Sequence, residues 1–323
     1  MIGTRAVPVA AGAIRHVLMA APSFDEAPDF RAKIEEVVPN LRIVNAGAVP
    51  DELIDIVICD DLCAFDPSGV TNASAFLSLS LGVDRLLAFG IRPHVQIARL
   101  LTPEHQWLMR EYVADHLLGA QRRSEIAKGQ HAERRWECMP PQAPMAGRKA
   151  VVMGMGFLGE PTALLLRNFG LIVTGWSRTA RPVPGIRCIS GSAALSEAVR
   201  DADYLISLLP LTNATRRLIG PTLLRSLSSR AMLINASRAG CLDERALASM
   251  LREGLLASAV LDVIDEEPLP ADSPLWDVPN LLITPHSAAV PRSKAYIPAI
   301  VDALGRLIDG RAPAHLVDRA RGY

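Results

Sequence analysis

The chain has 323 residues, of which 50% are hydrophobic and 21% are charged. This length allows two domains with separate cores, and the composition is typical of a globular protein rather than a disordered one. The 34 Lys and Arg residues balance 34 Asp and Glu residues, so no net charge favours binding to nucleic acid or to an anionic membrane. No apolar run approaches the roughly 20 residues of a membrane helix. We expect a cytoplasmic protein without nucleic-acid or membrane partners, and a loose leader over residues 1–13.

Short apolar segments rich in β-branched residues alternate with polar or helical segments along most of the chain. They cover residues 16–20, 41–45, 55–59, 94–100, 149–154, 171–176, 204–209, 231–236, 257–263 and 280–285. Strands that are apolar throughout and are separated by helices predict parallel sheets covered on both faces. The sequence therefore predicts an α/β protein with two doubly wound parallel-sheet domains.

Three other segments contribute to the predicted organisation. A long helical pattern begins with Thr102 as the N-cap and Pro103 at the first helical position. The segment 136–149 contains three prolines and is expected to be a surface excursion. The last segment, 294–310, predicts an amphipathic helix that Pro298 interrupts early.

The five cysteines, Cys59, Cys63, Cys138, Cys188 and Cys241, are scattered along the chain. Cys59 and Cys63 are accompanied neither by a second close pair nor by clustered histidines, so their spacing does not indicate a zinc site. We expect reduced thiols and no bound metal.

The segment AVVMGMGFLGEPTALLLRNFG predicts a strand, a glycine-rich turn and a helix. Gly154 would allow the tight turn, Gly156 the approach of the backbone to a pyrophosphate, and Gly159 close packing of helix and strand. The strand that follows completes a βαβ unit, which is the setting that this glycine pattern requires. We predict a dinucleotide site with phosphates at the helix N-terminus; the alternative is a tight turn without a ligand.

The end of the second strand of this unit indicates which dinucleotide is bound. An NAD site usually has Asp or Glu there to bind the ribose hydroxyls. This chain has instead Ser177, Arg178 and Thr179, with Arg181 slightly further on. An arginine at this point can pair with a 2′-phosphate, so we predict that NADP(H) is preferred and that NAD(H) is possible. The alternative is that these arginines form a solvated loop face.

Polar residues follow three later strands, where open α/β sheets bind their ligands. Arg238 is a planar cation suited to hold a carboxylate or to polarise a carbonyl. His286 can supply a proton, since an ordinary histidine titrates near pH 6.5. Glu267, if it is hydrogen-bonded to His286, would favour the protonated ring and fix its orientation. Together these residues predict reduction of a 2-keto acid, although each alone could be a surface residue.

At this point the chain resembles the D-isomer-specific 2-hydroxyacid dehydrogenases. The segments GMGFLG, LLPLTNATRRLI, INASRAGCLDERAL, LDVIDEEPLP and NLLITPHSAA match the ordered motifs of this family over roughly residues 148–290. Within the family, WSRT and the closing VDRARGY are similar to the bacterial NADPH-preferring glyoxylate/hydroxypyruvate reductases.

The resemblance implies a domain organisation and a set of roles. Residues 101–290 would form the dinucleotide-binding Rossmann domain, and residues 1–100 plus 291–323 a flavodoxin-like substrate domain, with a cleft between them. Arg238, Glu267 and His286 would be the catalytic set, and the substrate a small 2-keto or 2-hydroxy acid. A homodimer joined through the dinucleotide domain is also implied.

Two further residue sets follow from the pattern and the resemblance. The backbone N–H groups of a glycine loop would hold the substrate carboxylate, and the predicted substrate-binding residues are Leu81, Gly82, Arg238 and His286. For Leu81 and Gly82, the alternative is a strand that ends in an ordinary glycine turn. Asp262 would contact the cofactor or support the site. The predicted cofactor-binding residues are Gly154, Gly156, Phe157, Leu158, Gly159, Trp176, Ser177, Arg178, Thr179, Leu209, Pro210, Thr215, Ala236, Ser237, Asp262 and Ser287.

The chain departs from the family pattern at two places. Ala239 replaces the usual glycine after the arginine, which is tolerable only at negative φ. Asp60 and Asp61 stand where the reductase branch has an aromatic residue and prolines, and they either face solvent or favour a substrate with a cationic or polyhydroxyl tail. A larger 2-keto acid, with a pocket shaped by Phe65, Leu81 and the helix from Glu104, is therefore an alternative. A dinucleotide-sensing, corepressor-like binding protein is another.

Overall fold

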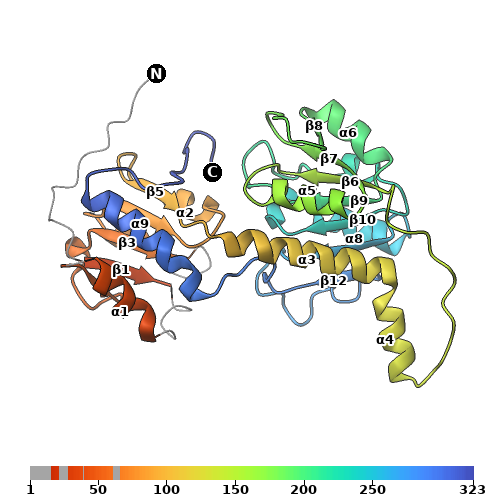
Figure 1. Ribbon diagram of the computed structural model, residues 1–323, viewed down its shortest axis with the longest axis horizontal. Coiled ribbons are helices and arrows are strands. Elements are labelled where there is room, and N and C mark those ends of the chain that lie inside the picture. The colour runs from red at the N-terminus through yellow and green to blue at the C-terminus, as the bar shows by residue number, and fades with distance from the viewer. Residues whose placement is uncertain (1–15, 22–27, 39, 61–65) are drawn as a thin grey trace. The chain divides into compact units, whose positions relative to one another are not determined.

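A computed structural model of the chain describes residues 16–21, 28–38, 40–60 and 66–323 (Figure 1). The chain forms two compact units. The first unit is Met1–Glu104 with Pro291–Tyr323, and the second unit is His105–Val290. Asp61, Cys63, Phe65 and the segment 1–13, which the sequence analysis singled out, lie outside the described residues.

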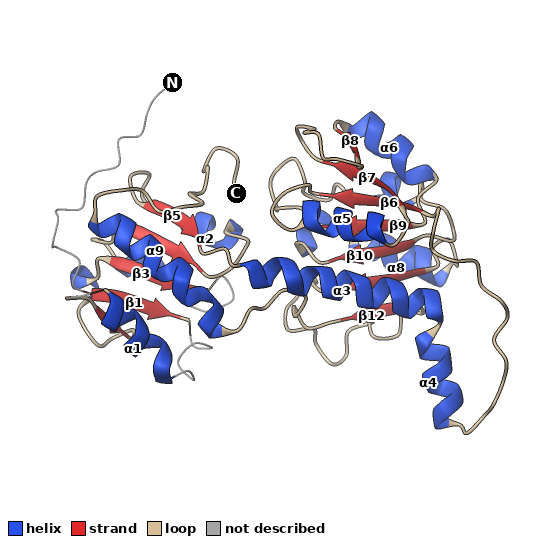
Figure 2. Cartoon of the chain, viewed as in Figure 1, coloured by secondary structure: helices blue, strands red, loops and turns tan. Residues whose placement is uncertain are grey.

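The first unit contains a five-stranded parallel sheet in the order β2-β1-β3-β4-β5 (Figure 2). Its strands are β1 His16–Ala20, β2 Arg42–Val44, β3 Ile56–Cys59, β4 Ala75–Ser78 and β5 Gln96–Arg99. Its α-helices are α1 Pro28–Val37, α2 Asp84–Ala88 and α9 Ile297–Ile308, with 3₁₀ turns at Asp51–Leu53, Pro67–Gly69 and Ser293–Tyr296.

Both faces of this first sheet are buried. Val17 of β1 packs in one core cluster with Ile34 of α1 and Ile300 of α9. The next residue, Leu18, belongs to a second cluster that includes Leu86 of α2. Because successive side chains of a strand point to opposite faces, a strand covered on both sides must be apolar throughout.

The second unit contains a seven-stranded parallel sheet in the order β12-β11-β10-β9-β6-β7-β8. Its strands are β6 Lys149–Met153, β7 Ile172–Trp176, β8 Arg187–Ile189, β9 Tyr204–Ser207, β10 Met232–Asn235, β11 Ser258–Leu261 and β12 Leu281–Ile283. Its α-helices are α4 Ser124–Ala132, α5 Gly159–Asn168, α6 Ser192–Arg200, α7 Pro221–Leu224 and α8 Glu244–Arg252, with a 3₁₀ turn at Ala239–Cys241. Helix α3, Pro103–Arg122, begins two residues before this unit and supplies most of its length to it.

The second sheet is also covered on both faces, and its strand order locates a site. Val152 of β6 packs with Val113 of α3 and Ala163 of α5, whereas Val151 packs with helices α6 and α8 on the other face. The chain order reverses between β6 and β9. In doubly wound sheets ligands bind outside the carboxyl ends of the strands at such a reversal.

The predicted α/β class with two parallel sheets is confirmed, and two local predictions differ from the structure. Strand β8 was not predicted, because it is a three-residue edge strand with a polar first residue. Pro298 does not interrupt the last helix but lies in its first turn, where the missing N–H has no intrahelical acceptor to lose. Among the described residues, no helix has the length and hydrophobicity needed to span a membrane.

Candidate active site

Five strands of the second sheet end in segments that carry predicted site residues. Gly154 follows β6, Leu209 follows β9, Arg238 follows β10, Asp262 follows β11 and His286 follows β12. Since these strands are parallel neighbours, their carboxyl ends share one edge of the sheet. The structure therefore brings residues from separate sequence motifs to a common edge.

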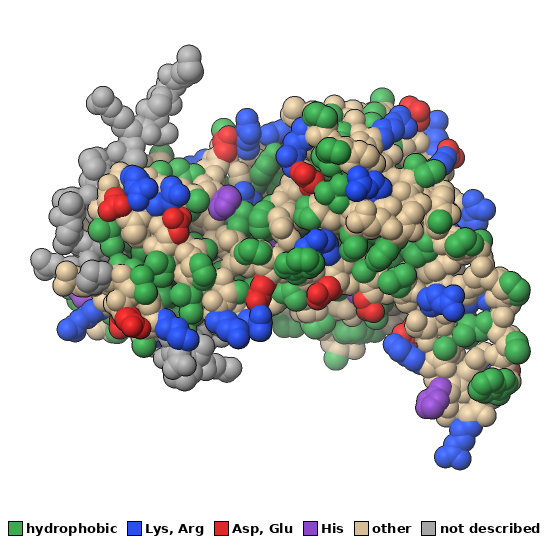
Figure 3. Space-filling model, viewed as in Figure 1, with side chains coloured by type: hydrophobic (Ala, Val, Ile, Leu, Met, Phe, Trp, Pro, Cys, Tyr) green, Lys and Arg blue, Asp and Glu red, His purple; other side chains and the backbone are tan. Residues whose placement is uncertain are grey.

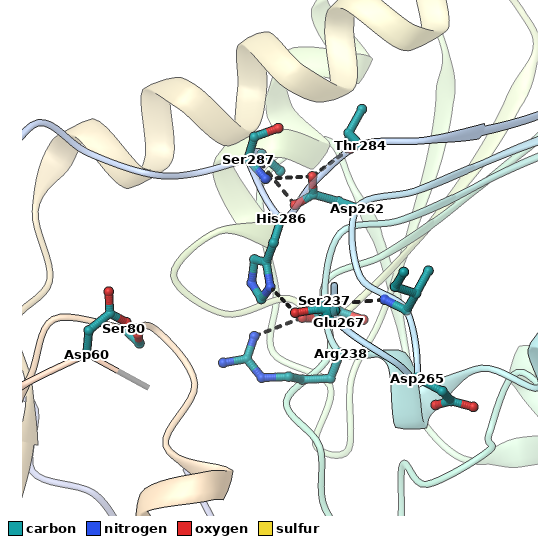
Figure 4. Close-up of polar contacts among 12 residues, drawn as sticks. Asp60, Ser80, Ser237, Arg238, Asp262, Asp265, Glu267, Thr284, His286 and Ser287 are labelled. Atoms are coloured by element: carbon teal, nitrogen blue, oxygen red, sulfur yellow. Dashed lines mark hydrogen bonds and ion pairs between the residues drawn. The ribbon is translucent and has the colours of Figure 1, made fainter. Parts of the chain in front are cut away.

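His286 is held from both its backbone and its ring. Its Nδ1 lies 3.0 Å from Oε2 of Glu267 (Figure 4). Its backbone N–H donates to the carbonyl oxygens of Asp262 and Thr284, at 3.0 and 2.9 Å, and its φ of 52° is left-handed. The other oxygen of Glu267 accepts from the backbone N–H of Ile264 at 3.2 Å. With Nδ1 facing Glu267, Nε2 is the ring nitrogen that can serve a reacting group.

Asp262 organises the segment that carries His286. Asp262 is 3% exposed, and its carboxylate accepts hydrogen bonds from Thr284 Oγ1 at 2.6 Å, Ser287 N at 2.9 Å and Ala288 N at 3.0 Å (Figure 4). The hydroxyl of Thr284 also lies 2.7 Å from the hydroxyl of Tyr112 on α3. Burial, opposed by the Thr284 hydrogen bond, raises the pKa of Tyr112, and the charge of Asp262 adds to the increase.

Arg238 follows a rigid serine and asparagine network at the end of β10. Its Nη1 donates to the carbonyl oxygen of Ser237 at 2.9 Å. Ser237 Oγ lies 2.9 Å from Ser207 Oγ of β9 and donates to Asn235 Oδ1 at 2.6 Å. Ala239, the departure from the family pattern, begins a 3₁₀ turn and is absent from the left-handed residues of the described chain, so its methyl group meets the condition set by the sequence.

The three glycines of the glycine-rich turn have different surroundings. Gly154 has a φ of 97°, and a Cβ there would collide with the carbonyl of Leu208. A Cβ at Gly159 would collide with the carbonyl oxygen of Gly154. A Cβ at Gly156 would have no atom within 4 Å. Glycine is thus required at two positions for packing, while the space beside exposed Gly156, before the N-terminus of α5, is open to a ligand.

The segment after β7 contains two arginines that could bind a phosphate, and they differ in their contacts. Arg181 donates to the carbonyl oxygen of Met155 at 3.0 Å and pairs with Glu160, so it is already engaged. Arg178 and Thr179 are exposed. The Trp176 indole is buried and donates to the carbonyl oxygen of Gly191 at 2.9 Å. Among these side chains, those of Arg178 and Thr179 can reach a ligand.

The other predicted cofactor residues form the walls of this edge. Thr215 is buried, and its Oγ1 donates to the carbonyl oxygen of Pro210 at 2.7 Å, which fixes the loop after β9. Leu209, Ala236 and Ser237 are buried, whereas Ser287 is exposed. Phe157 and Leu158 are half-buried in the glycine-rich turn.

In the first unit, the predicted substrate loop follows β4. Leu81 and Gly82 are half-buried, and Tyr296 donates to the carbonyl oxygen of neighbouring Leu79 at 3.0 Å. Ser80 donates to Asp60 Oδ1 (Figure 4). The Asp60 carboxylate therefore accepts a hydrogen bond from the predicted substrate loop. The sequence had suggested instead that Asp60 faces solvent or favours a substrate with a cationic or polyhydroxyl tail.

Sequence reasoning missed Glu244, the first residue of α8. Its Oε1 accepts from the backbone N–H of Asp265 at 2.6 Å. Burial raises the pKa of Glu244 to about 7, with the charges of Asp265 and Glu267 adding to the increase. An acid after the N-cap Asp243, which accepts from Ala246 N at 3.0 Å, is ordinary for a helix start, so the local pattern did not single it out.

Comparison with known proteins identifies relatives over most of the chain. Residues 114–288 match the family described as D-isomer specific 2-hydroxyacid dehydrogenase, NAD binding domain. Glyoxylate/hydroxypyruvate reductase A from Escherichia fergusonii is 34% identical over 255 residues, which are 77% of this chain and 81% of the relative.

Solved structures agree with this match over both units. A D-isomer specific 2-hydroxyacid dehydrogenase from Xanthobacter autotrophicus Py2, in complex with NADPH and MES, has a TM-score of 0.86 at 31% identity and covers 96% of this chain and 100% of its own. An NADPH-dependent glyoxylate/hydroxypyruvate reductase from Sinorhizobium meliloti, in complex with NADP and sulfate, has a TM-score of 0.84 at 28% identity with the same coverage.

Proposed function

Because the chain belongs to the D-isomer specific 2-hydroxyacid dehydrogenase family, and is thus an oxidoreductase, we propose that it reduces small 2-keto acids of the glyoxylate and hydroxypyruvate type to D-2-hydroxy acids. The observation that carries this proposal is the His286–Glu267 pair, which lies at the same sheet edge as Arg238 and the glycine-rich turn. The names of the relatives support the substrate class.

His286 is the proposed proton donor. The carboxylate of Glu267 fixes the imidazole through Nδ1, so the Nε2–H is directed to the oxygen of the substrate carbonyl as it gains negative charge. Asp262 supports this geometry by fixing the backbone N–H groups of Ser287 and Ala288. Arg238 binds the substrate carboxylate or polarises its carbonyl. The backbone N–H groups of Leu81 and Gly82 are the proposed additional donors to the substrate carboxylate.

NADPH is the proposed cofactor, and the residues present fit it. The open space beside Gly156, in the turn that leads into α5, admits a pyrophosphate. Exposed Arg178 and Thr179 offer a cation and a hydroxyl for a 2′-phosphate, and the segment has no carboxylate that would repel it. When bound, the nicotinamide supplies the hydride that the keto carbon accepts.

The first experiment follows oxidation of NADPH and of NADH with glyoxylate, hydroxypyruvate, pyruvate and a branched 2-keto acid. His286→Ala should lower kcat by about 100-fold or more, as expected for loss of a general acid, and should leave NADPH affinity unchanged. His131→Ala, which removes an exposed histidine of α4, is the matched control. Wild-type turnover by His286→Ala would exclude the proposed proton donor.

A second set of variants tests the cofactor. Arg178→Ala should weaken NADPH binding by about 10-fold or more and leave NADH binding unchanged, because a charge-assisted hydrogen bond contributes about 1.5–3 kcal/mol. Arg187→Ala, at an exposed arginine of β8, controls for the loss of surface charge. Equal loss of affinity for both dinucleotides would contradict the assignment of Arg178 to the 2′-phosphate.

A further inference from the structure

The second unit has a cavity at the sheet edge opposite to the candidate active site. Its volume is about 370 Å³. The first residues of β9, β10 and β11, which are Tyr204, Met232 and Ser258, form its floor. The end of α3 and the loop before β6 form its walls. Because the strands are parallel, their amino ends lie away from the edge that carries Arg238 and His286.

Three arginines line this cavity, namely Arg123, Arg148 and Arg230, and no Asp or Glu does. Within residues 66–323 and the other described ranges, none of the three forms an ion pair, whereas other arginines, such as Arg181 and Arg292, pair with carboxylates. Like charges that share one cavity repel each other, and the repulsion is greater where water is partly excluded. The cluster is therefore an uncompensated positive site.

Capping of α3 does not account for this charge. Arginines are common at helix C-termini, where they neutralise the last carbonyl groups. Here the carbonyl oxygen of Ala120 accepts from the backbone N–H of Arg123 at 3.2 Å. Turned so that its oxygen faces Arg123, the side-chain amide of Gln142 accepts from Arg123 Nε at 2.8 Å and donates to the carbonyl oxygen of Gln121. These two carbonyl groups at the end of α3 have acceptor roles that involve no guanidinium group, and Arg123, Arg148 and Arg230 line the cavity.

The walls of the cavity are fixed before any ligand enters. Arg148 Nη1 donates to the hydroxyl of Tyr204 at 3.1 Å, and the ring of Tyr204 is buried. Gln121 Nε2 donates to the carbonyl oxygen of Ala143 at 2.7 Å, which ties the loop to α3. Preorganised donors lower the entropy cost of binding.

We propose that this cavity binds a small anion that carries a phosphate group. A phosphate ester has close to two negative charges and three acceptor oxygens at neutral pH, and guanidinium groups bind such oxygens in pairs. A volume of about 370 Å³ lies in the range of about 300–1,000 Å³ that is usual for small-molecule sites. This site is separate from the dinucleotide site, since it lies at the amino ends of the strands.

Calorimetric titration with inorganic phosphate tests the proposal, in the presence of saturating NADPH so that phosphate cannot occupy the glycine-rich turn. Arg148→Gln and Arg230→Gln should each weaken phosphate binding by about 10-fold or more, the usual loss for a charge-assisted hydrogen bond. Arg225→Gln, at the exposed arginine that follows α7, should bind phosphate like the wild type. Malonate should bind more weakly than phosphate because its carboxylates are further apart.

Heat of binding does not depend on turnover, so the result stands whether or not a 2-keto acid is reduced. Arg230→Gln leaves the Tyr204 hydrogen bond intact, and unchanged NADPH affinity of both variants would show that they are folded. Absence of phosphate binding to the wild type, or equal binding to all variants, would overturn the proposal. So would a changed sedimentation coefficient of Arg148→Gln with unchanged phosphate affinity, since the cluster would then be a contact between copies.

Discussion

Replacement of Glu244 by glutamine should stabilise the second unit above neutral pH. The carboxyl group accepts from the backbone N–H of Asp265, and burial raises its pKa from the ordinary value of 4.5 to about 7. A glutamine of the same shape can still accept that hydrogen bond through its side-chain oxygen. It carries no charge to be buried or repelled by Asp265 and Glu267. The variant therefore isolates the cost of ionising this group.

The magnitude follows from proton linkage. An acid with a raised pKa in the folded state contributes stability below its unfolded pKa, here 4.5, and this stability is lost as the pH rises through about 7. The two pKa values correspond to at most about 3.4 kcal/mol, at about 1.36 kcal/mol per pKa unit. Because Glu244 is only half-buried, solvent screening reduces this to about 1–2 kcal/mol.

Urea unfolding followed by tryptophan fluorescence measures this difference in the second unit alone. All four tryptophans, Trp107, Trp136, Trp176 and Trp276, lie in that unit, and Trp176 is buried in its core. Glu244→Gln should be more stable than the wild type by about 1–2 kcal/mol near pH 8 and nearly equal to it near pH 4.5. Glu197→Gln, at an exposed acid of α6, should show no pH-dependent difference.

A variant that is equal to the wild type, or less stable, near pH 8 would refute this reasoning. It would show that the Glu244 carboxylate is solvated, or that its charge is compensated by Arg217, whose own charge lowers the pKa of Glu244. A gain of the same size at both pH values would instead indicate an uncharged packing effect.

Four other substitutions test the packing of the site by the same unfolding measurement. Asp262→Ala should lower the free energy of unfolding by about 2–5 kcal/mol, since the buried N–H of Ala288 and the part-buried N–H of Ser287 lose their acceptor; a loss below about 1 kcal/mol would show that water replaces the carboxylate. Gly159→Ala should cost about 2–4 kcal/mol because its Cβ meets the Gly154 carbonyl. Gly156→Ala should change stability by less than about 0.5 kcal/mol and weaken only NADPH binding in a fluorescence titration. Tyr112→Phe should lower the free energy of unfolding by about 1 kcal/mol through loss of the Thr284 contact. An unchanged free energy of unfolding would show that the Tyr112 hydroxyl is hydrated instead.

Much of the fold could be predicted because most strands are buried on both faces. Residues 204–207 and 232–235 are buried without exception, so an apolar run in the sequence corresponds directly to a strand. The rule fails at the edge of the sheet, where no residue of β8 is fully buried and Arg187 is exposed. It also fails for Pro298, since a proline within a helical pattern has the same local appearance whether it breaks a helix or begins one.

The same geometry explains which part of the site could be predicted. Arg238, Asp262 and His286 each follow a strand, and parallel strands end at one edge, so position along the chain is sufficient to bring them together. Glu244 lies at a helix start and acts through a hydrogen bond to Asp265, a contact that no strand register specifies.

The arginine cavity lies beyond sequence reasoning for a further reason. Arg123 follows a helix, Arg148 precedes one strand, and Arg230 precedes another, so each has an ordinary local interpretation as a surface cation. Only the fold shows that they share one cavity without a carboxylate. Periodicity in the sequence predicts where strands begin and end, and hence which residues lie at a functional edge. A cluster of positive charge also depends on the absence of carboxylates around it. Only the folded unit shows that no carboxylate lines this cavity. The proposed binding site at the amino ends of the strands could therefore be recognised only from the structure.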